Sequence, residues 1–259
     1  MKDLTDVIKE NSRWEGKDAF PATKEWRLEI NKWLQFIIDR GQFDRFLPRL
    51  KDKPEKRDEA LAEITAAYYL SSIHGCKIVE WEPLGKNRKR GEFSFSVSNN
   101  STIVFCEIKS PGWEADIAKQ NKSSPRLKQR KLLKDPEFRW YDNAQDTRNT
   151  LLKASDQIPD NIPSLLIITD DFFMPNHEDD YIGIKKALFH KKQSHPDVDF
   201  TDSVPQGCFV DATFANISAL AALNYDKPVF SNNIKYYWKI FKNPNSKLQI
   251  PHELMNMSE

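Results

Sequence analysis

Apolar residues in the first part of the chain recur with the period of a helix. Residues 1 to about 50 are predicted to be helical, with an apolar stripe that runs from Trp26 to Ile37 and is closed by Gly41. A second helical pattern covers residues 58–74. It is followed by Gly75, a residue suited to the left-handed conformation of a C-terminal cap. Both patterns predict helices that bury one face.

A short polar stretch separates the two helical patterns. Residues 51–57 are all charged except for Pro54, which is typical of a connecting segment. We therefore expect residues 1–54 to form a helical N-terminal extension. It would pack on a larger domain that spans residues 55–259.

After Gly75 the pattern changes to alternation, which is typical of β-strands. Strands are predicted at residues 77–82, 91–98, 101–110 and 164–169. The last of these carries apolar side chains on both faces, as a strand inside a covered sheet does. A helical pattern at residues 142–156 lies between the third and fourth strands. This order predicts an α/β or α+β fold with a mixed central sheet flanked by helices.

The C-terminal part of the chain carries weaker patterns. A short helix is predicted at residues 181–192, and strands are predicted at residues 208–210 and 236–241. Residues 214–223 are apolar but follow neither period clearly, so that helix and strand both remain open. We find no internal repeat.

The second and third strands are predicted to form a hairpin, and its register decides which side chains meet. Asn99–Asn100 supplies residues that tolerate the positive φ angles of a two-residue turn. With the turn there, Phe93 lies opposite Cys106, and Glu92 lies opposite Glu107. Directly paired residues have Cβ atoms about 4.5–5.5 Å apart, where two acids destabilise a hairpin unless a cation lies between them.

A divalent metal is the cation that best explains this pair of acids. Mg²⁺ takes oxygen ligands from carboxylates, water and phosphate, and Mn²⁺ suits the same ligands. Lys109 lies two residues beyond Glu107 and therefore projects from the same face of the strand. Glu63 shares a helical stripe with small and apolar residues, so we expect its carboxylate to face the sheet, either as part of the site or as a buried acid paired with Lys or Arg. These residues together predict a site for phosphodiester hydrolysis.

The overall composition leaves the class of partner open. Thirty-nine basic and 38 acidic residues among 259 give a net charge of +1. Only eight glycines are present, and neither GxGxxG nor GxxxxGK[ST] occurs, which argues against the common nucleotide-binding loops. The three widely spaced cysteines indicate reduced thiols. Without a signal peptide or an apolar run near the ~18 residues of a membrane span, we expect a cytoplasmic protein with no membrane contact.

Local charge is more informative, because basic residues gather on both sides of the acidic hairpin. One basic cluster leads into Glu92 and consists of Lys86, Arg88, Lys89 and Arg90. The other follows the third strand and consists of Lys119, Lys122, Arg126, Lys128, Arg130, Lys131 and Lys134. Contacts to phosphate dominate affinity for nucleic acid, so we expect both clusters to bind a nucleic acid backbone. A solvated loop is the alternative interpretation of each.

These residues, in this order, resemble the PD-(D/E)xK nuclease superfamily, which has the restriction-endonuclease-like fold. The resemblance covers residues 58–169 and consists of Glu63, Glu92, the triplet Glu107-Ile108-Lys109, and Gln157. It implies that Glu92, Glu107 and the main-chain carbonyl of Ile108 hold the metal. It also implies that Lys109 assists the attacking water and that Glu63 supports the metal shell, with Gln157 in the catalytic set. The family usually has Asp after Pro where this chain has Gly91-Glu92.

The function expected from the sequence is a Mg²⁺- or Mn²⁺-dependent nuclease that acts on DNA. A catalytically impaired nucleic-acid-binding module of the same fold is the alternative, motivated by Glu92 in place of Asp. A retaining glycosidase also places two carboxyls about 5–5.5 Å apart. Its general acid requires a raised pKa, however, and Lys109 would oppose that. The sequence does not reveal whether the chain forms a homo-oligomer.

Overall fold

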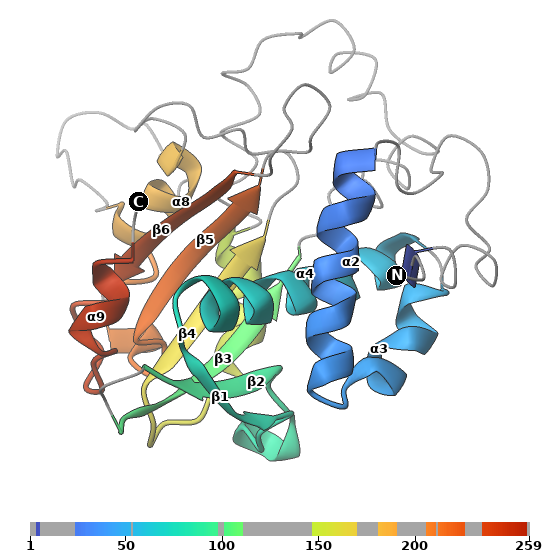
Figure 1. Ribbon diagram of the computed structural model, residues 1–259. Coiled ribbons are helices and arrows are strands. Elements are labelled where there is room, and N and C mark those ends of the chain that lie inside the picture. The colour runs from blue at the N-terminus through green and yellow to red at the C-terminus, as the bar shows by residue number, and fades with distance from the viewer. Residues whose placement is uncertain are drawn as a thin grey trace, which may run out of the picture.

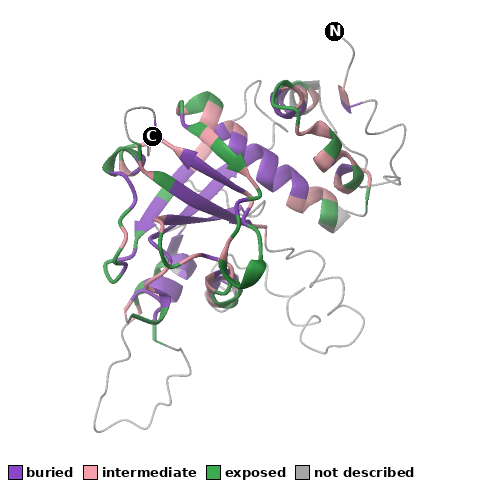
Figure 2. Cartoon of the chain, turned by 90° about the horizontal axis from the view of Figure 1, so that it is seen from below, coloured by how far each residue is buried: buried purple, intermediate pink, exposed green. Residues whose placement is uncertain are grey.

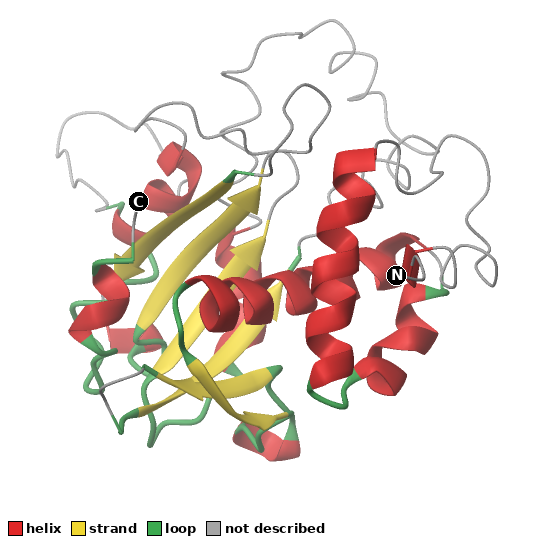
Figure 3. Ribbon diagram, viewed as in Figure 1, coloured by secondary structure: helices red, strands yellow, loops and turns green. Residues whose placement is uncertain are grey.

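The computed structural model of the chain describes residues 4–5, 24–52, 54–97, 101–110, 147–169, 181–190, 206–210, 212–225 and 235–257. These residues form an α+β fold around one six-stranded mixed sheet (Figures 1 and 3). None of the helices within the described ranges has the length and hydrophobicity of a membrane-spanning segment.

Three helices precede the sheet. They are α2 (Lys24–Asp39), α3 (Phe43–Leu50) and α4 (Pro54–Tyr68), and α4 continues as a π-helical turn at Tyr69–Ile73. Gly41 and Gly75 have φ angles of +65° and +67°, the left-handed conformation expected where each helical pattern ends. α4 begins at Pro54 rather than at residue 58, because proline is tolerated in the first turn of a helix.

The strands lie in the sheet in the order in which they occur in the chain. They are β1 (Lys77–Trp81), β2 (Phe93–Ser96), β3 (Ile103–Lys109), β4 (Ser164–Thr169), β5 (Ala219–Tyr225) and β6 (Tyr236–Lys242). β1, β2 and β3 are antiparallel, β3, β4 and β5 are parallel, and β6 is again antiparallel. The mixed sheet predicted from the sequence is therefore confirmed.

Helices connect the parallel strands, as parallel pairing requires. The helix with described residues 147–155 lies between β3 and β4, and α8 (Ile182–Phe189) lies between β4 and β5. The apolar stretch at residues 214–223 divides between a short 3₁₀ turn, Ala212–Phe214, and the strand β5. A last short helix, α9 (His252–Met255), follows β6.

The sheet has a hydrophobic core on each face, and alternate residues of β4 enter different cores. Leu165 and Ile167 belong to the core shared with α2, α3 and α4. Leu166 and Ile168 belong to the opposite core, which contains residues of the 147–155 helix and of α8. Buried residues accordingly run along the inner strands β2, β3, β4 and β5 (Figure 2). The apolar run of β4 is thus explained by burial on both faces.

The N-terminal helices share the first of these cores with the rest of the protein. Trp33 of α2 and Phe46 of α3 are fully buried in the same cluster as Ile64 of α4 and Phe93 of β2. Because α4 is covered by the sheet on one side and by α2 and α3 on the other, residues 60–67 are all buried. This double cover places any polar residue of that stretch inside the protein.

The strand predicted at residues 208–210 is wrong. These residues form a turn whose N–H groups pair with the end of α8: Cys208 donates to the carbonyl of Ala187, and Phe209 donates to that of Leu188, both at 2.8 Å. The apolar residues Cys208 and Phe209 are buried against the second core without joining the sheet. A short apolar run that packs on the end of a helix is not distinguished by its pattern from a short strand.

Candidate active site

The hairpin register predicted from the sequence is confirmed. Phe93 pairs with Cys106, and Phe95 pairs with Val104, in the antiparallel ladder between β2 and β3. The predicted turn, Asn99–Asn100, lies outside the described residues. The register places Glu107 and Lys109 on one face of β3, at its C-terminal end. This part of β3 pairs with β4.

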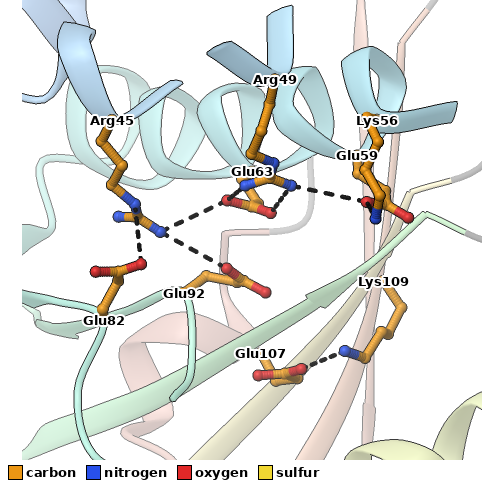
Figure 4. A network of polar contacts seen from close by, with 9 residues as sticks. All are labelled: Arg45, Arg49, Lys56, Glu59, Glu63, Glu82, Glu92, Glu107 and Lys109. Carbon is orange, nitrogen blue, oxygen red and sulfur yellow. Dashed lines mark hydrogen bonds and ion pairs between the residues drawn. The ribbon is translucent and has the colours of Figure 1, made fainter. Parts of the chain in front are cut away.

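Glu92 lies one residue before β2, in a bend rather than in the ladder. Its N–H donates to the carbonyl oxygen of Cys106 (3.1 Å), so the ladder does not extend to a regular pair between Glu92 and Glu107. Its side chain nevertheless lies between those of Glu63 and Glu107 (Figure 4), close enough for both charges to act on it. Glu92 therefore comes close to Glu107, as predicted, although the two residues do not pair directly in the ladder.

Glu107 is fully buried, and its two carboxylate oxygens differ in their contacts. Oε1 accepts a hydrogen bond from Nζ of Lys109, whereas Oε2 is buried and has no hydrogen-bond partner. Nζ of Lys109 also donates to Oε1 of Gln157 at 3.2 Å. Gln157 lies in the turn that follows the 147–155 helix, so the crossover between β3 and β4 delivers it to Lys109. Glu107, Lys109 and Gln157 are thus brought together.

Glu63 reaches the site from α4 and is held by arginines. Arg49 donates two hydrogen bonds to its carboxylate, at 2.8 Å and 2.5 Å, and Nη2 of Arg45 lies 3.6 Å from Oε2. This bidentate geometry is the strongest form of ion pair between side chains. The inward direction predicted for Glu63 is observed, and the arginine partners satisfy its charge.

Three residues that surround these acids were not predicted from the sequence: Arg45, Arg49 and Glu82. Arg45 and Arg49 are four residues apart on α3 and so lie on one face of that helix. Their spacing could have predicted that both arginines lie on one face of the helix. It could not predict which acidic residues they contact. Glu82 follows β1, and its carboxylate lies 3.4 Å from Nε of Arg45.

Burial of the two strand acids favours their neutral forms. Burial raises the pKa of Glu92 to about 9, with the charges of Glu63 and Glu107 adding to the effect and Lys109 opposing it. Burial also raises the pKa of Glu107, although Lys109 counteracts the shift through its charge and its hydrogen bond. The site therefore contains less positive charge than two ionised buried carboxylates need.

The raised pKa of Glu92 predicts that stability in a metal chelator decreases as the pH rises. The folded protein binds a proton at Glu92 more tightly than the unfolded chain, whose glutamate has a pKa near 4.5. The resulting stabilisation is complete below about pH 4.5 and is lost as the pH rises to about 9. Urea unfolding between pH 5 and 9 should show this decline, and Glu92→Gln should flatten it. An equal slope in both proteins would contradict the predicted shift.

The donor set fits a divalent cation with few protein ligands. Oε2 of Glu107 is a buried oxygen without a partner, and Glu92 is a second carboxylate beside it. Ile108, whose main-chain carbonyl is the third predicted ligand, follows Glu107 in β3. Within the described ranges, no three acidic, histidine or cysteine side chains form a group that could hold a metal. The candidate set is therefore two carboxylates and one main-chain oxygen, which suits an ion that keeps several water ligands.

The first basic cluster forms an exposed loop between β1 and β2. Lys86 pairs with Asp160 (3.1 Å), and Nη1 of Arg90 donates to the carbonyl of Glu82 (2.9 Å). Arg88 and Lys89 are exposed to solvent. The second basic cluster, from Lys119 to Lys134, lies outside the described residues.

This loop is fixed to the turn that carries Gln157. The N–H of Lys86 donates to the carbonyl oxygen of Gln157 at 2.7 Å. A Cβ atom on Gly85 would lie 2.3 Å from that same oxygen, so only glycine permits the approach. The loop and the Lys109–Gln157 contact are therefore held at a constant separation.

Comparisons of the chain with protein-family models, with curated proteins and with solved structures found no match.

Proposed function

We propose that this chain is a metal-dependent nuclease of the PD-(D/E)xK superfamily, with the restriction-endonuclease-like fold, and that it cleaves DNA. The observation that carries the proposal is the buried carboxylate of Glu107. One of its oxygens contacts Lys109, the other has no partner, and Glu92 approaches from the start of the neighbouring strand. Lys109 thus accounts for one oxygen of this buried carboxylate, and the other oxygen is a position that a metal cation would fill.

In this proposal, Glu92, Glu107 and the carbonyl oxygen of Ile108 hold Mg²⁺ or Mn²⁺. Such an ion, when bound, lowers the pKa of a water molecule and stabilises negative charge on a phosphoryl group. Lys109 donates a hydrogen bond to the attacking water or to the developing charge. Gln157 and Glu107 restrict the position of Nζ by accepting hydrogen bonds from it.

The charge balance of the site supports a role for the metal in binding substrate. The acids of the site are Glu63, Glu82, Glu92 and Glu107, and its cations are Arg45, Arg49 and Lys109. With every group ionised, the acids exceed the cations by one charge. A divalent ion reverses that sign and makes the site attractive to a DNA backbone.

The arrangement of the sheet is compatible with this superfamily. α4 precedes three antiparallel strands, a helix follows, and β4 then pairs in parallel with β3. The candidate residues come from four of these segments, and they meet where β3 ends. The restriction-endonuclease-like fold remains a proposal that this order supports.

A second candidate function is a nucleic-acid-binding module that does not cleave. The observation that favours it is the pairing of Glu63 and Glu92 with arginines, because both acids have positively charged neighbours without a metal. Such a module would bind DNA with or without divalent ions. The two functions therefore differ in metal-dependent cleavage.

Incubation of the purified protein with supercoiled, linear and single-stranded DNA tests the proposed function. We expect breakdown of at least one form in Mg²⁺ or Mn²⁺ and none in EDTA. A filter-binding measurement on the same DNA accompanies each reaction. Binding without cleavage of any form, in either metal, would favour the binding module and contradict the nuclease.

The exposed cations of the first basic cluster should contribute to binding rather than to chemistry. We expect Arg88→Gln/Lys89→Gln to weaken DNA binding to a similar extent for unrelated sequences. The slope of log affinity against log salt concentration should fall by roughly 0.9 for each phosphate that the variant no longer binds. Lys239→Gln/Lys242→Gln, on exposed positions of β6 at the opposite edge of the sheet, is the control. An unchanged slope in the first variant would show that the loop does not contact DNA phosphates.

A further inference from the structure

The position of the Glu92 side chain is not determined by strand pairing. The residue lies in a bend before β2, where its main-chain N–H and carbonyl groups are paired but its side chain stands outside the ladder. A side chain outside a ladder is free to choose among rotamers unless other groups restrict it. A metal ligand requires such a restriction, because ligation depends on direction as well as on charge.

Arg45 is placed to restrict Glu92, whose side chain also forms a hydrogen bond with Glu63. Its Nη2 atom lies 3.8 Å from Oε2 of Glu92 and 3.6 Å from Oε2 of Glu63, and its Nε atom lies 3.4 Å from Oε1 of Glu82. The three acids come from α4 and from the two ends of the loop between β1 and β2. A single guanidinium therefore joins the segments that meet at Glu92 (Figure 4).

The guanidinium of Arg45 is itself held in place. It lies over the rings of Phe46 (4.8 Å) and Trp81 (5.4 Å), and its side chain is only 19% exposed. Cation–π contacts of this kind help to hold an arginine in place. The position of the guanidinium is therefore restricted, and the carboxylates of the three acids orient toward it.

Glu82 connects the same arginine to the backbone of Glu92. Its N–H donates to the carbonyl oxygen of Glu92 at 3.0 Å, and its carboxylate contacts Arg45. Glu82 adopts a φ angle of +53°, which is unfavourable for a residue other than glycine. The surrounding structure maintains this strained conformation, and it keeps both ends of the loop against the guanidinium.

We propose that Arg45 is a positioning residue that orients the Glu92 carboxylate for metal binding. The inference rests on the proposed function, because it presupposes that Glu92 is a ligand. It assigns α3, a helix of the N-terminal region, to the assembly of the site as well as to the core.

A cation that merely neutralises the acids would behave differently from one that positions them. Removing a neutralising cation leaves more negative charge, so Mn²⁺ should bind more tightly. Removing a positioning residue leaves Glu92 free to turn away, so Mn²⁺ should bind less tightly. Lysine retains the charge but lacks the planar fork that reaches three carboxylates. Arg45→Lys therefore distinguishes the role of Arg45 in orienting Glu92 from the effect of its positive charge.

The experiment is calorimetric titration of the full chain with Mn²⁺ in the absence of DNA. We expect Arg45→Lys to weaken Mn²⁺ binding several-fold and Arg45→Met to weaken it by about tenfold or more, as loss of a group that orients a ligand does. Arg40→Met is the matched control, since Arg40 also lies over an aromatic ring (Phe36, 3.8 Å) but bonds to Ser71 away from the acids. Its Mn²⁺ affinity should equal that of the wild type.

Other results of the titration would overturn either the positioning role of Arg45 alone or the proposed function as well. Wild-type affinity in Arg45→Lys, or tighter binding by Arg45→Met, would overturn the positioning role and leave the proposed function intact. Absence of saturable Mn²⁺ binding by the wild type would overturn both. Thermal unfolding of each variant shows whether it is folded, and Arg45→Lys, which keeps the charge inside the acid cluster, provides the result if Arg45→Met does not fold.

Discussion

Glu107→Gln is expected to reduce metal-dependent DNA cleavage by at least about 10³-fold while the protein remains folded. The substitution preserves the shape of a fully buried side chain but removes the charge that a divalent ion requires. Loss of the several kcal/mol that a bound metal contributes to the transition state corresponds to this factor. Because burial raises the pKa of Glu107, the neutral amide should also be tolerated by the fold. In EDTA the variant should unfold at a temperature no lower than the wild type.

Glu80→Gln provides the matched control for this prediction. Glu80 is an exposed acid of β1, so its replacement alters the same charge without touching the site. We expect wild-type cleavage from Glu80→Gln when both variants are purified and assayed in parallel. Substantial cleavage by Glu107→Gln would remove Glu107 from the metal shell, and a loss in both variants would indicate an effect of charge alone.

Lys109→Met should lower turnover by about 10²- to 10³-fold and leave Mn²⁺ binding unchanged or tighter. A proton-donating side chain in the transition state contributes a factor of this order. Methionine retains most of the apolar length of the lysine stem, which is partly buried, but it cannot donate to Glu107 or Gln157. Loss of the cation reduces repulsion of the metal, so the binding isotherm should not weaken.

The test of Lys109 compares single-turnover cleavage rates with Mn²⁺ affinities. Lys153→Met serves as its control, because Lys153 is an exposed lysine of the nearby 147–155 helix. If Lys109→Met weakened Mn²⁺ binding in proportion to the rate, Lys109 would act on the metal site rather than on the reacting atoms. A wild-type rate would exclude it from the chemistry.

The hairpin could be predicted because its register depends on local information. The alternation around Phe93 and Phe95 identifies the buried face, and the turn predicted at residues 99–100 gives the pairs that are observed between β2 and β3. The shared face of Glu107 and Lys109 followed correctly from that register. The end of the ladder could not be predicted, because Glu92 leaves the strand to form contacts with residues far away in the sequence, which no local pattern contains.

The partners of Glu63 illustrate a second limit of sequence reasoning. Small neighbours on α4 correctly predicted that this acid points inward. They could not show that α3 would cover it and supply Arg49, because the packing of one helix on another depends on tertiary structure. The periodicity of a helix predicts in which direction a side chain points. It does not predict which residue that side chain contacts.

The central claim is that Glu92 and Glu107 hold a divalent metal, and the electron paramagnetic resonance signal of free Mn²⁺ tests it most directly. Addition of the wild-type protein should reduce this signal in a saturable manner at neutral pH. Neither Glu92→Gln nor Glu107→Gln should reduce it to a comparable extent. If the wild type left the signal unchanged, or if both variants reduced it as the wild type does, the metal would not be bound by these two acids.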